Sequence, residues 1–155
     1  MNVSIGKKAP AFSLPDHTGE TVKLSQLKGS VVILYFYPKD DTSTCTKQAC
    51  DYRDHTKAFE VDGAVVIGVS PDSPTSHAKF RAKYDLPFTL LADEEHEVCE
   101  KYGVWQEKSM YGRKYMGVVR STVVIDAAGV VRAVFSPVNM KTHVKDLQDA
   151  VKACA

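Results

Sequence analysis

The sequence of 155 residues has no excess of charge of one sign and no long apolar stretch. Twenty Lys and Arg residues stand against 19 Asp and Glu residues, so the formal net charge at pH 7 is only +1. A charge this close to zero gives no reason to expect a nucleic-acid or anionic-membrane partner. No apolar run approaches the roughly 20 residues that a transmembrane helix needs. We therefore expect a protein that binds neither nucleic acid nor a membrane.

Residues 1–8, MNVSIGKK, have no apolar run after their positive charges, in contrast to a secretory signal. The chain also has no Cys-x-x-Cys pair, although it contains four cysteines. Cysteines in a chain without such a signal are typical of reduced, cytoplasmic thiols. They are more often catalytic or buried than joined in a structural disulfide framework. We therefore expect a cytoplasmic protein whose thiols are free.

Composition and length are those of an ordinary globular protein. Hydrophobic residues make up 44% of the sequence and charged residues 25%. The length suits one domain over residues 1–155 with a substantial core. No internal repeat, low-complexity segment or linker suggests a division of the chain.

Two runs of strand-forming residues, 31–37 and 64–70, have the length and composition of strands that are buried on both faces of a parallel sheet. The segment between them predicts a helix over 44–61. A second helix, over 73–84, begins with Ser73 as its N-cap, followed by a proline. The remaining predicted elements are strands over 12–14, 21–24, 89–91, 122–125 and 130–135, helices over 95–102 and 141–153, and an irregular loop over 103–119.

This order of elements predicts an α/β protein with a mixed central sheet, helices on both faces of the sheet and an N-terminal β-hairpin. The turn after the strand 31–37 lies at the carboxyl end of a central parallel strand, where open α/β sheets usually have their ligand sites. The loop over 103–119 contains Trp105, Tyr111, Tyr115 and three basic residues. It would be a solvated loop, a wall of the site or a contact for a partner, and the sequence leaves these alternatives open.

The sequence YFYPKDDTSTCTKQACDYR, over residues 35–53, runs from a predicted strand through a polar turn into a helix. Cys45 lies in the first turn of this helix, where the backbone N–H groups have no internal partner and the macrodipole is positive. Both effects favour a thiolate over a thiol and make the sulfur reactive. Free cysteines are often simply small buried hydrophobes, but a polar turn and a helix start disfavour that interpretation.

Pro38, Thr42 and Cys45 form a Pro-x-x-x-Thr-x-x-Cys pattern, which resembles the active-site motif of the peroxiredoxins. The sequence is most similar to their Q-type branch, the bacterioferritin comigratory proteins, and to the atypical two-cysteine members. The resemblance extends over nearly the whole chain, with further matches at GKKAPAFSL (6–14), FTLLAD (88–93), YGVW (102–105) and RSTVVID (120–126). It implies a thioredoxin-like fold and a thiol-dependent peroxidase that reduces hydrogen peroxide and organic hydroperoxides without a metal, haem or flavin.

The resemblance assigns Cys45 as the peroxidatic cysteine, which attacks one peroxide oxygen and becomes a sulfenic acid. Thr42 would accept a hydrogen bond from the peroxide or donate one to the thiolate, and Pro38 would shield the thiolate from water. Arg120 matches the arginine that reaches the cysteine sulfur and stabilises charge on the departing oxygen. Gln48, one helical turn after Cys45, is a weaker candidate for orienting Arg120 or the loop.

Cys50 is the candidate resolving cysteine. It would capture the sulfenic acid as a Cys45–Cys50 disulfide, which thioredoxin or a similar dithiol protein would reduce. Relatives without this cysteine often have the resolver in the next helix, and here the helix over 73–84 contains no cysteine. Five residues of α-helix separate two Cα atoms by about 8–9 Å, whereas a disulfide needs them closer than about 7 Å. The start of the helix must therefore unwind before the disulfide forms.

The sequence departs from the family at Ser43 and Thr44, where most relatives have Pro-Gly. Two hydroxyl residues still suit a helix N-cap. The fixed φ of proline and the freedom of glycine are lost, however, which leaves the rigidity of this loop open. The chain also lacks the long C-terminal arm with a resolving cysteine that decameric relatives have, which favours a monomer.

These residues also suggest other interpretations. A zinc site made of Cys45, Cys50, His55 and Cys99 is disfavoured because their spacing does not match the usual zinc-ligand patterns. We expect Cys99 in the core, Cys154 in the C-terminal tail and the histidines at the surface. A thiol–disulfide oxidoreductase on the same fold is disfavoured because there is no Cys-x-x-Cys pair. A non-catalytic redox sensor would use the same thiol, and catalytic peroxide turnover would distinguish it from an enzyme.

Overall fold

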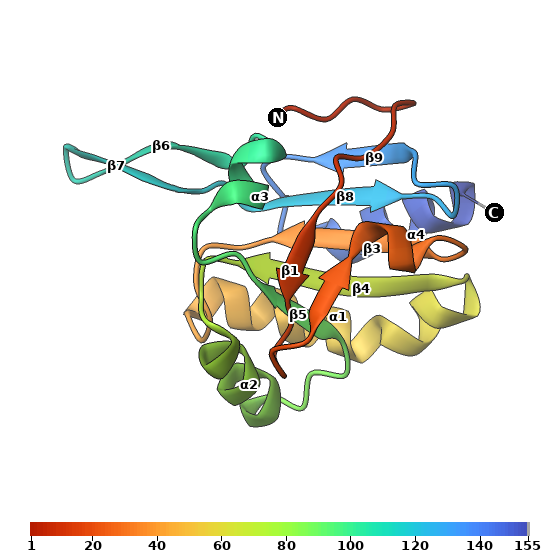
Figure 1. Ribbon diagram of the computed structural model, residues 1–155, viewed down its shortest axis with the longest axis horizontal. Helices are drawn as coiled ribbons and strands as arrows, with labels where there is room; N and C mark the ends of the chain where they lie inside the picture. Colours follow the sequence, from red (N-terminus) through yellow and green to blue (C-terminus); the bar gives the residue numbers. More distant parts are fainter. Residues whose placement is uncertain (155) are drawn as a thin grey trace.

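The computed structural model describes residues 1–154 and is built around a five-stranded sheet with the strand order β5-β4-β3-β8-β9 (Figure 1). Its strands are β3 (Val31–Phe36), β4 (Ala64–Ser70), β5 (Thr89–Ala92), β8 (Ser121–Ile125) and β9 (Val131–Phe135). β3 pairs in parallel with β4, and β4 with β5, whereas β8 is antiparallel to both β3 and β9. The prediction of a mixed central sheet is confirmed.

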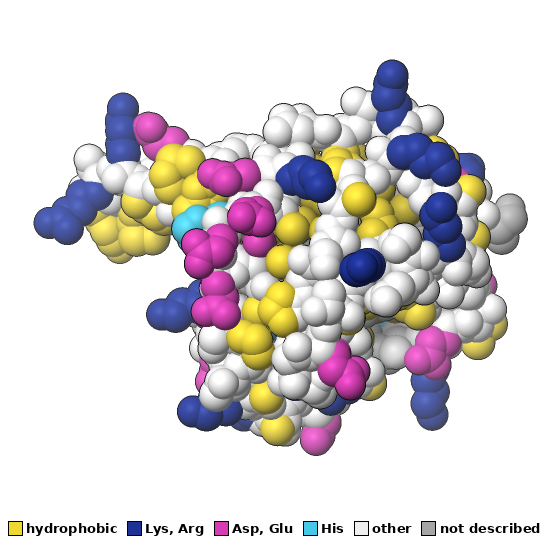
Figure 2. All heavy atoms as spheres, in the orientation of Figure 1, with side chains coloured by type: hydrophobic (Ala, Val, Ile, Leu, Met, Phe, Trp, Pro, Cys, Tyr) yellow, Lys and Arg dark blue, Asp and Glu magenta, His cyan; other side chains and the backbone are white. Residues whose placement is uncertain are grey.

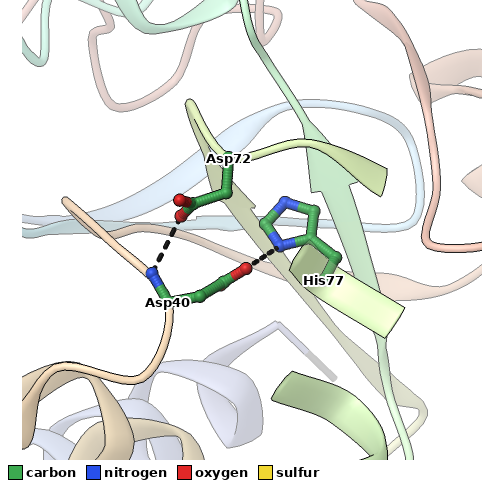
Figure 3. A group of neighbouring side chains, drawn as sticks. All are labelled: Asp40, Asp72 and His77. Atoms are coloured by element: carbon green, nitrogen blue, oxygen red, sulfur yellow. Dashed lines mark hydrogen bonds and ion pairs between the residues drawn. The ribbon is translucent and has the colours of Figure 1, made fainter. Parts of the chain in front are cut away.

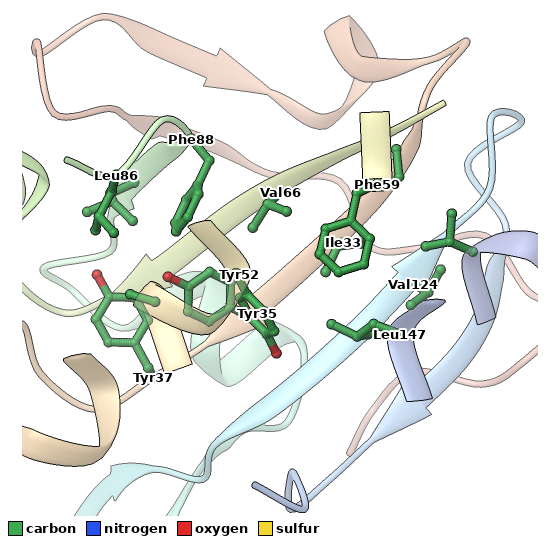
Figure 4. Packing of buried hydrophobic residues seen from close by; sticks show 14 of the residues in the cluster. Ile33, Tyr35, Tyr37, Tyr52, Phe59, Val66, Leu86, Phe88, Val124 and Leu147 are labelled. Atoms are coloured by element: carbon green, nitrogen blue, oxygen red, sulfur yellow. The ribbon is translucent and has the colours of Figure 1, made fainter. Parts of the chain in front are cut away.

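Helices cover both faces of this sheet, as the sequence predicts. They are α1 (Ser43–Val61), α2 (Pro74–Lys83), α3 (Glu97–Lys101) and α4 (His143–Ala153). α1 and α4 pack against one face, where the rings of Tyr35, Tyr37 and Tyr52 lie close together (Figure 4). The N-terminal segment and α3 cover the other face. No helix among the described residues is long and apolar enough to cross a membrane.

The N-terminal β-hairpin is also confirmed. It consists of β1 (Ser13–Pro15) and β2 (Thr21–Lys23), which pair antiparallel. A short 3₁₀ helix, η1 (Leu24–Leu27), follows directly and is absent from the sequence-based prediction. Short turns of this kind carry too little periodicity to be recognised in a sequence.

The central strand β3 determines where the active-site segment lies. Every residue of β3 is buried, as its run of β-branched and aromatic residues predicts. The chain leaves the sheet after Phe36, passes through residues 37–42 and enters α1 at Ser43. The first turn of α1 therefore lies at the carboxyl end of a central parallel strand.

The prediction of an irregular loop over 103–119 is wrong. The chain there forms an antiparallel hairpin of β6 (Trp105–Met110) and β7 (Arg113–Val118), which extends away from the rest of the molecule (Figure 1). Tyr111 and Gly112 both have positive φ, as a two-residue hairpin turn requires. Both faces of the hairpin are largely exposed, so its strands lack the apolar alternation that reveals half-buried strands. Figure 2 shows basic and hydrophobic side chains along this hairpin and acidic side chains near its base.

The prediction that the histidines lie at the surface is wrong for His77 and His143, which are both buried. His77 lies 2.7 Å from a carboxylate oxygen of Asp40, and His143 lies 2.8 Å from one of Asp51. A buried imidazole is tolerated when polar partners replace its hydration. These partners are distant in the sequence, so residue spacing alone gives no sign of them.

Candidate active site

Cys45 is the third residue of α1, and its side chain lies below the molecular surface. The residue is only 2% exposed and belongs to the cluster of buried residues between α1 and the sheet. The polar turn therefore does not expose the sulfur, in contrast to what the sequence suggests. The first helical hydrogen bond, from the Thr46 amide to the Thr42 carbonyl, is formed at 2.8 Å. The sulfur thus lies beside a completed helix start, at the positive end of the helix dipole.

Arg120 gives this buried sulfur a charged partner. Its Nη2 donates to Cys45 Sγ at 3.2 Å, and its Nη1 donates to Gln48 Oε1 at 2.7 Å. The guanidinium is always charged and presents its donors in a rigid plane. It stabilises negative charge on the sulfur in a place where an unpaired charge would be costly. The structure therefore brings together three predicted site residues.

Gln48 is held in turn by a buried polar chain. Its Nε2 donates to the Tyr52 hydroxyl at 3.1 Å, and that hydroxyl lies 3.4 Å from Thr122 Oγ1 on β8. Gln48 and Tyr52 are both buried. With its amide nitrogen directed to Tyr52, Gln48 must present its carbonyl oxygen to Arg120. This arrangement fits Gln48 as the residue that orients the guanidinium.

Thr42 lies at the N-cap of α1, and its hydroxyl makes its hydrogen bond within the loop rather than to Cys45. The hydroxyl donates to the Lys39 carbonyl at 2.9 Å. Its single proton is thereby used, so its oxygen lone pairs remain free to accept. Of the two roles left open by the sequence, the geometry favours acceptance from a substrate over donation to the thiolate. Pro38, half-buried, lies at the start of the same loop.

The hairpin of β6 and β7 contributes one residue to the surroundings of this site. Lys108 donates from Nζ to the Val118 carbonyl at 2.7 Å, two residues before Arg120. Burial and the nearby charge of Arg120 lower the pKa of Lys108, while Cys45 acts in the opposite direction. The hairpin therefore places Lys108 close enough to Arg120 and Cys45 for their charges to affect its pKa.

Cys45 and Cys50 are both free thiols, and α1 runs without a break through both. The two cysteines are therefore not joined in this structure. Directly after Cys50, the Asp51 carboxylate accepts from Lys47 at 3.0 Å and lies 2.8 Å from His143 Nε2 on α4. Burial opposes ionisation of Asp51, but hydrogen bonds from Lys47 and His143 lower its pKa overall. α1 is therefore anchored just beyond Cys50.

The other two thiols lie elsewhere. Cys99 is completely buried in α3, as predicted, and burial, followed by the Asp93 carboxylate, strongly raises its pKa. Cys154 donates from Sγ to the Ala150 carbonyl at 3.3 Å, and burial is the main cause that raises its pKa. Because their pKa values are raised, Cys99 and Cys154 should both be unreactive thiols at neutral pH.

The four residues considered above as zinc ligands do not form a cluster within residues 1–154. His55 Nδ1 instead lies 2.8 Å from the Asp51 carbonyl oxygen within α1. Within residues 1–154, the side chains that lie close enough to share an ion are Asp40, Asp72 and His77. These three satisfy one another with hydrogen bonds. Cys45, Cys50, His55 and Cys99 therefore do not form a shared cluster of ligand atoms within the described residues.

Comparison with known proteins gives a consistent result. A sequence model described as the AhpC/TSA family matches residues 5–134. A curated protein named putative peroxiredoxin bcp, from Coxiella burnetii, is 49% identical over 147 residues, which cover 95% of this chain and 97% of that protein. Peroxiredoxin Bcp of Bacillus subtilis is 47% identical over 152 residues, covering 98% of this chain and 97% of the relative.

A solved structure of the Xanthomonas campestris bacterioferritin comigratory protein superposes with a TM-score of 0.86. Its sequence is 33% identical, and the match covers 92% of this chain and 90% of that chain. Sequence and fold therefore agree over nearly the whole molecule. The chain belongs to the AhpC/TSA family and, within it, to the Bcp or Q-type peroxiredoxins with their thioredoxin-like fold.

Proposed function

We propose that this protein is a thiol peroxidase whose nucleophile is Cys45. The observation that carries this proposal is the contact of Arg120 with the Cys45 sulfur, held in place by Gln48. A sulfur at a helix start with a fixed guanidinium beside it is equipped to be a thiolate and a nucleophile. The Xanthomonas relative has been studied for alkyl peroxide reduction, which supports peroxides as the substrate class.

In the first step, the Cys45 thiolate attacks the terminal oxygen of a hydroperoxide. The O–O bond breaks, the sulfur becomes a sulfenic acid, and the other oxygen leaves as water or an alcohol after taking a proton. Arg120 stabilises the negative charge that develops on the departing oxygen. Thr42 accepts a hydrogen bond from the peroxide through its free lone pairs, and Pro38 limits the access of water to the sulfur.

In the second step, the Cys50 thiol attacks the sulfenic acid, water leaves and a Cys45–Cys50 disulfide forms. The helical segment between the two cysteines must unwind first, because an intact helix holds their Cα atoms too far apart. Unwinding breaks the contacts of Arg120 with Cys45 and Gln48, while Asp51 and His143 mark where the helix remains anchored. Thioredoxin or a similar dithiol protein then restores both thiols. A reducing compartment such as the cytoplasm suits an enzyme with four free cysteines.

Replacement of the nucleophile tests the proposed activity. In Cys45→Ser, peroxide consumption with a dithiol reductant should fall to the background rate, because a serine hydroxyl is not ionised near neutral pH. Cys154→Ser is the matched control, since it removes a thiol outside the site, and it should retain wild-type turnover. Measurable turnover by Cys45→Ser, or its absence in the wild type, would overturn the assignment.

Arg120 can be tested separately from peroxide chemistry. In Arg120→Ala and Arg120→Lys, the thiolate fraction of Cys45 at neutral pH should fall, and peroxide attack should slow by about 10²-fold, the usual effect of removing one charge-stabilising donor. Iodoacetamide alkylation across pH reports the thiolate, and single-turnover kinetics report the attack. Arg132→Ala, which removes an exposed arginine paired with Asp126, is the control. Unchanged alkylation and attack in both Arg120 variants would exclude a role for Arg120.

The proposed resolving role of Cys50 can be tested by what happens after the first reaction with peroxide. Cys50→Ser should react once with peroxide at near wild-type speed, then stop as a sulfenic acid and over-oxidise readily to sulfinic acid. Mass spectrometry of the peroxide-treated wild type should find Cys45 linked to Cys50. A link from Cys45 to Cys99, to Cys154 or to a second chain, or normal turnover of Cys50→Ser with thioredoxin, would show that Cys50 does not resolve the intermediate.

A further inference from the structure

A buried polar cluster lies beneath the loop that leads into α1, apart from the residues that contact the Cys45 sulfur. Its centre is the pair Asp40 and His77, whose side chains are 4% and 0% exposed (Figure 3). His77 Nδ1 lies 2.7 Å from Asp40 Oδ2. His77 belongs to α2, whereas Asp40 lies in the loop between β3 and α1. The pair therefore joins the active-site loop to a helix that contributes no residue to the proposed chemistry.

The hydrogen bonds fix the protons of this pair. His77 Nε2 lies 2.9 Å from the Leu91 carbonyl oxygen, which can only accept, so Nε2 carries a proton. Asp40 accepts from the Tyr37 hydroxyl at 2.5 Å and from the Ser76 hydroxyl at 2.8 Å. One further proton then lies between Nδ1 and the carboxylate. This proton completes the hydrogen bonds of both buried side chains within the protein.

Tyr37 supports this assignment. Burial, together with the neighbouring Tyr35 and Asp40, raises the pKa of Tyr37 well above its ordinary value, so the phenol keeps its proton and donates. Tyr37 directly follows β3, the strand that precedes the active-site loop. Asp40 is therefore held from two sides, by the end of β3 and by α2.

The backbone of the loop is fixed at the same place. The Asp40 amide donates to Asp72 Oδ2 at 2.8 Å (Figure 3). The same oxygen accepts from the Ser70 hydroxyl at 2.6 Å. The next residue, Asp41, adopts a φ of 58°, which side chains other than glycine rarely take. Thr42, the N-cap of α1, follows immediately. The position of the Thr42 hydroxyl and of the first helical turn thus depends on where Asp40 is held.

We propose that Asp40 and His77 are positioning residues for the peroxidase reaction, which act through the loop to hold Thr42 and the first turn of α1 around the Cys45 sulfur. This proposal rests on the proposed function of Cys45. Neither residue needs to touch the peroxide. A displacement of the loop by about 1 Å is enough to misalign a reaction and can cost about 10²-fold in rate.

Two rate constants separate positioning from general stability. Peroxide attack needs the thiolate, Thr42 and Arg120 in their places, whereas iodoacetamide alkylation needs mainly an accessible thiolate. In Asp40→Ala and His77→Asn, the ratio of the peroxide rate to the alkylation rate should fall at least about tenfold. Both rates are measured in single turnovers, well below the unfolding midpoint of each variant. A merely structural contribution would lower that midpoint and leave the ratio unchanged.

Conservative variants and a control complete the experiment. Asp40→Asn keeps an acceptor for Tyr37 and a donor for a neutral His77, so its ratio should recover most of the wild-type value. Asp149→Asn, which removes an exposed charge paired with Lys145 on α4, should leave the ratio unchanged. The double variant of Asp40→Ala with His77→Asn should lose little more than either single variant, as expected for residues that act as one unit.

The possible failures can be told apart. If the wild type consumes peroxide but Asp40→Ala and His77→Asn keep its ratio within about twofold, the positioning role is wrong while the proposed function stands. If the two losses simply add in the double variant, the residues do not act as a pair and the proposal also fails. If Asp40→Ala does not fold, the ratio of the peroxide rate to the alkylation rate in His77→Asn alone decides whether the positioning role is correct. Absence of turnover in the wild type would instead refute the function itself.

Discussion

The contact between the Arg120 guanidinium and the Cys45 sulfur is the interaction on which the rest of this site depends. A sulfur that is almost fully buried among apolar and aromatic residues would be a poor thiolate without a charged partner. Arg120 lies directly before β8 and Cys45 at the start of α1, so one side chain joins the sheet to the helix. Gln48 and Tyr52 hold the guanidinium in that position.

In the proposed reaction, the same contact would couple the chemistry at Cys45 to unfolding of the helix start. It stabilises the folded first turn of α1 while the sulfur is a thiolate. Oxidation to the neutral sulfenic acid removes the negative charge with which Arg120 pairs, so this stabilisation weakens when the helix must unwind. The contact between Asp51 and His143 holds α1 just beyond Cys50, so it would limit how far the proposed unwinding extends along the helix.

The sequence predicted the features that depend on local pattern. The buried run of β3, the Ser73-Pro74 start of α2 and the motif around Cys45 are all visible as residue spacing, and the structure has each of them. The hairpin of β6 and β7 escaped prediction because its exposed strands carry no apolar periodicity. The burial of His77 escaped because Asp40 and Leu91, its partners, are separated from it by many residues and meet only in the folded chain.

Partial unfolding of α1 during the proposed reaction can be measured directly by amide hydrogen exchange of the reduced and the peroxide-oxidised protein. Exchange over residues 44–51 should be faster in the oxidised form, while the buried strand β3 stays protected in both, because local opening leaves the core intact. Equal protection of residues 44–51 in the two forms would contradict the unfolding of the helix start. Loss of protection that spreads into β3 would contradict it as well, since the change would then be global unfolding.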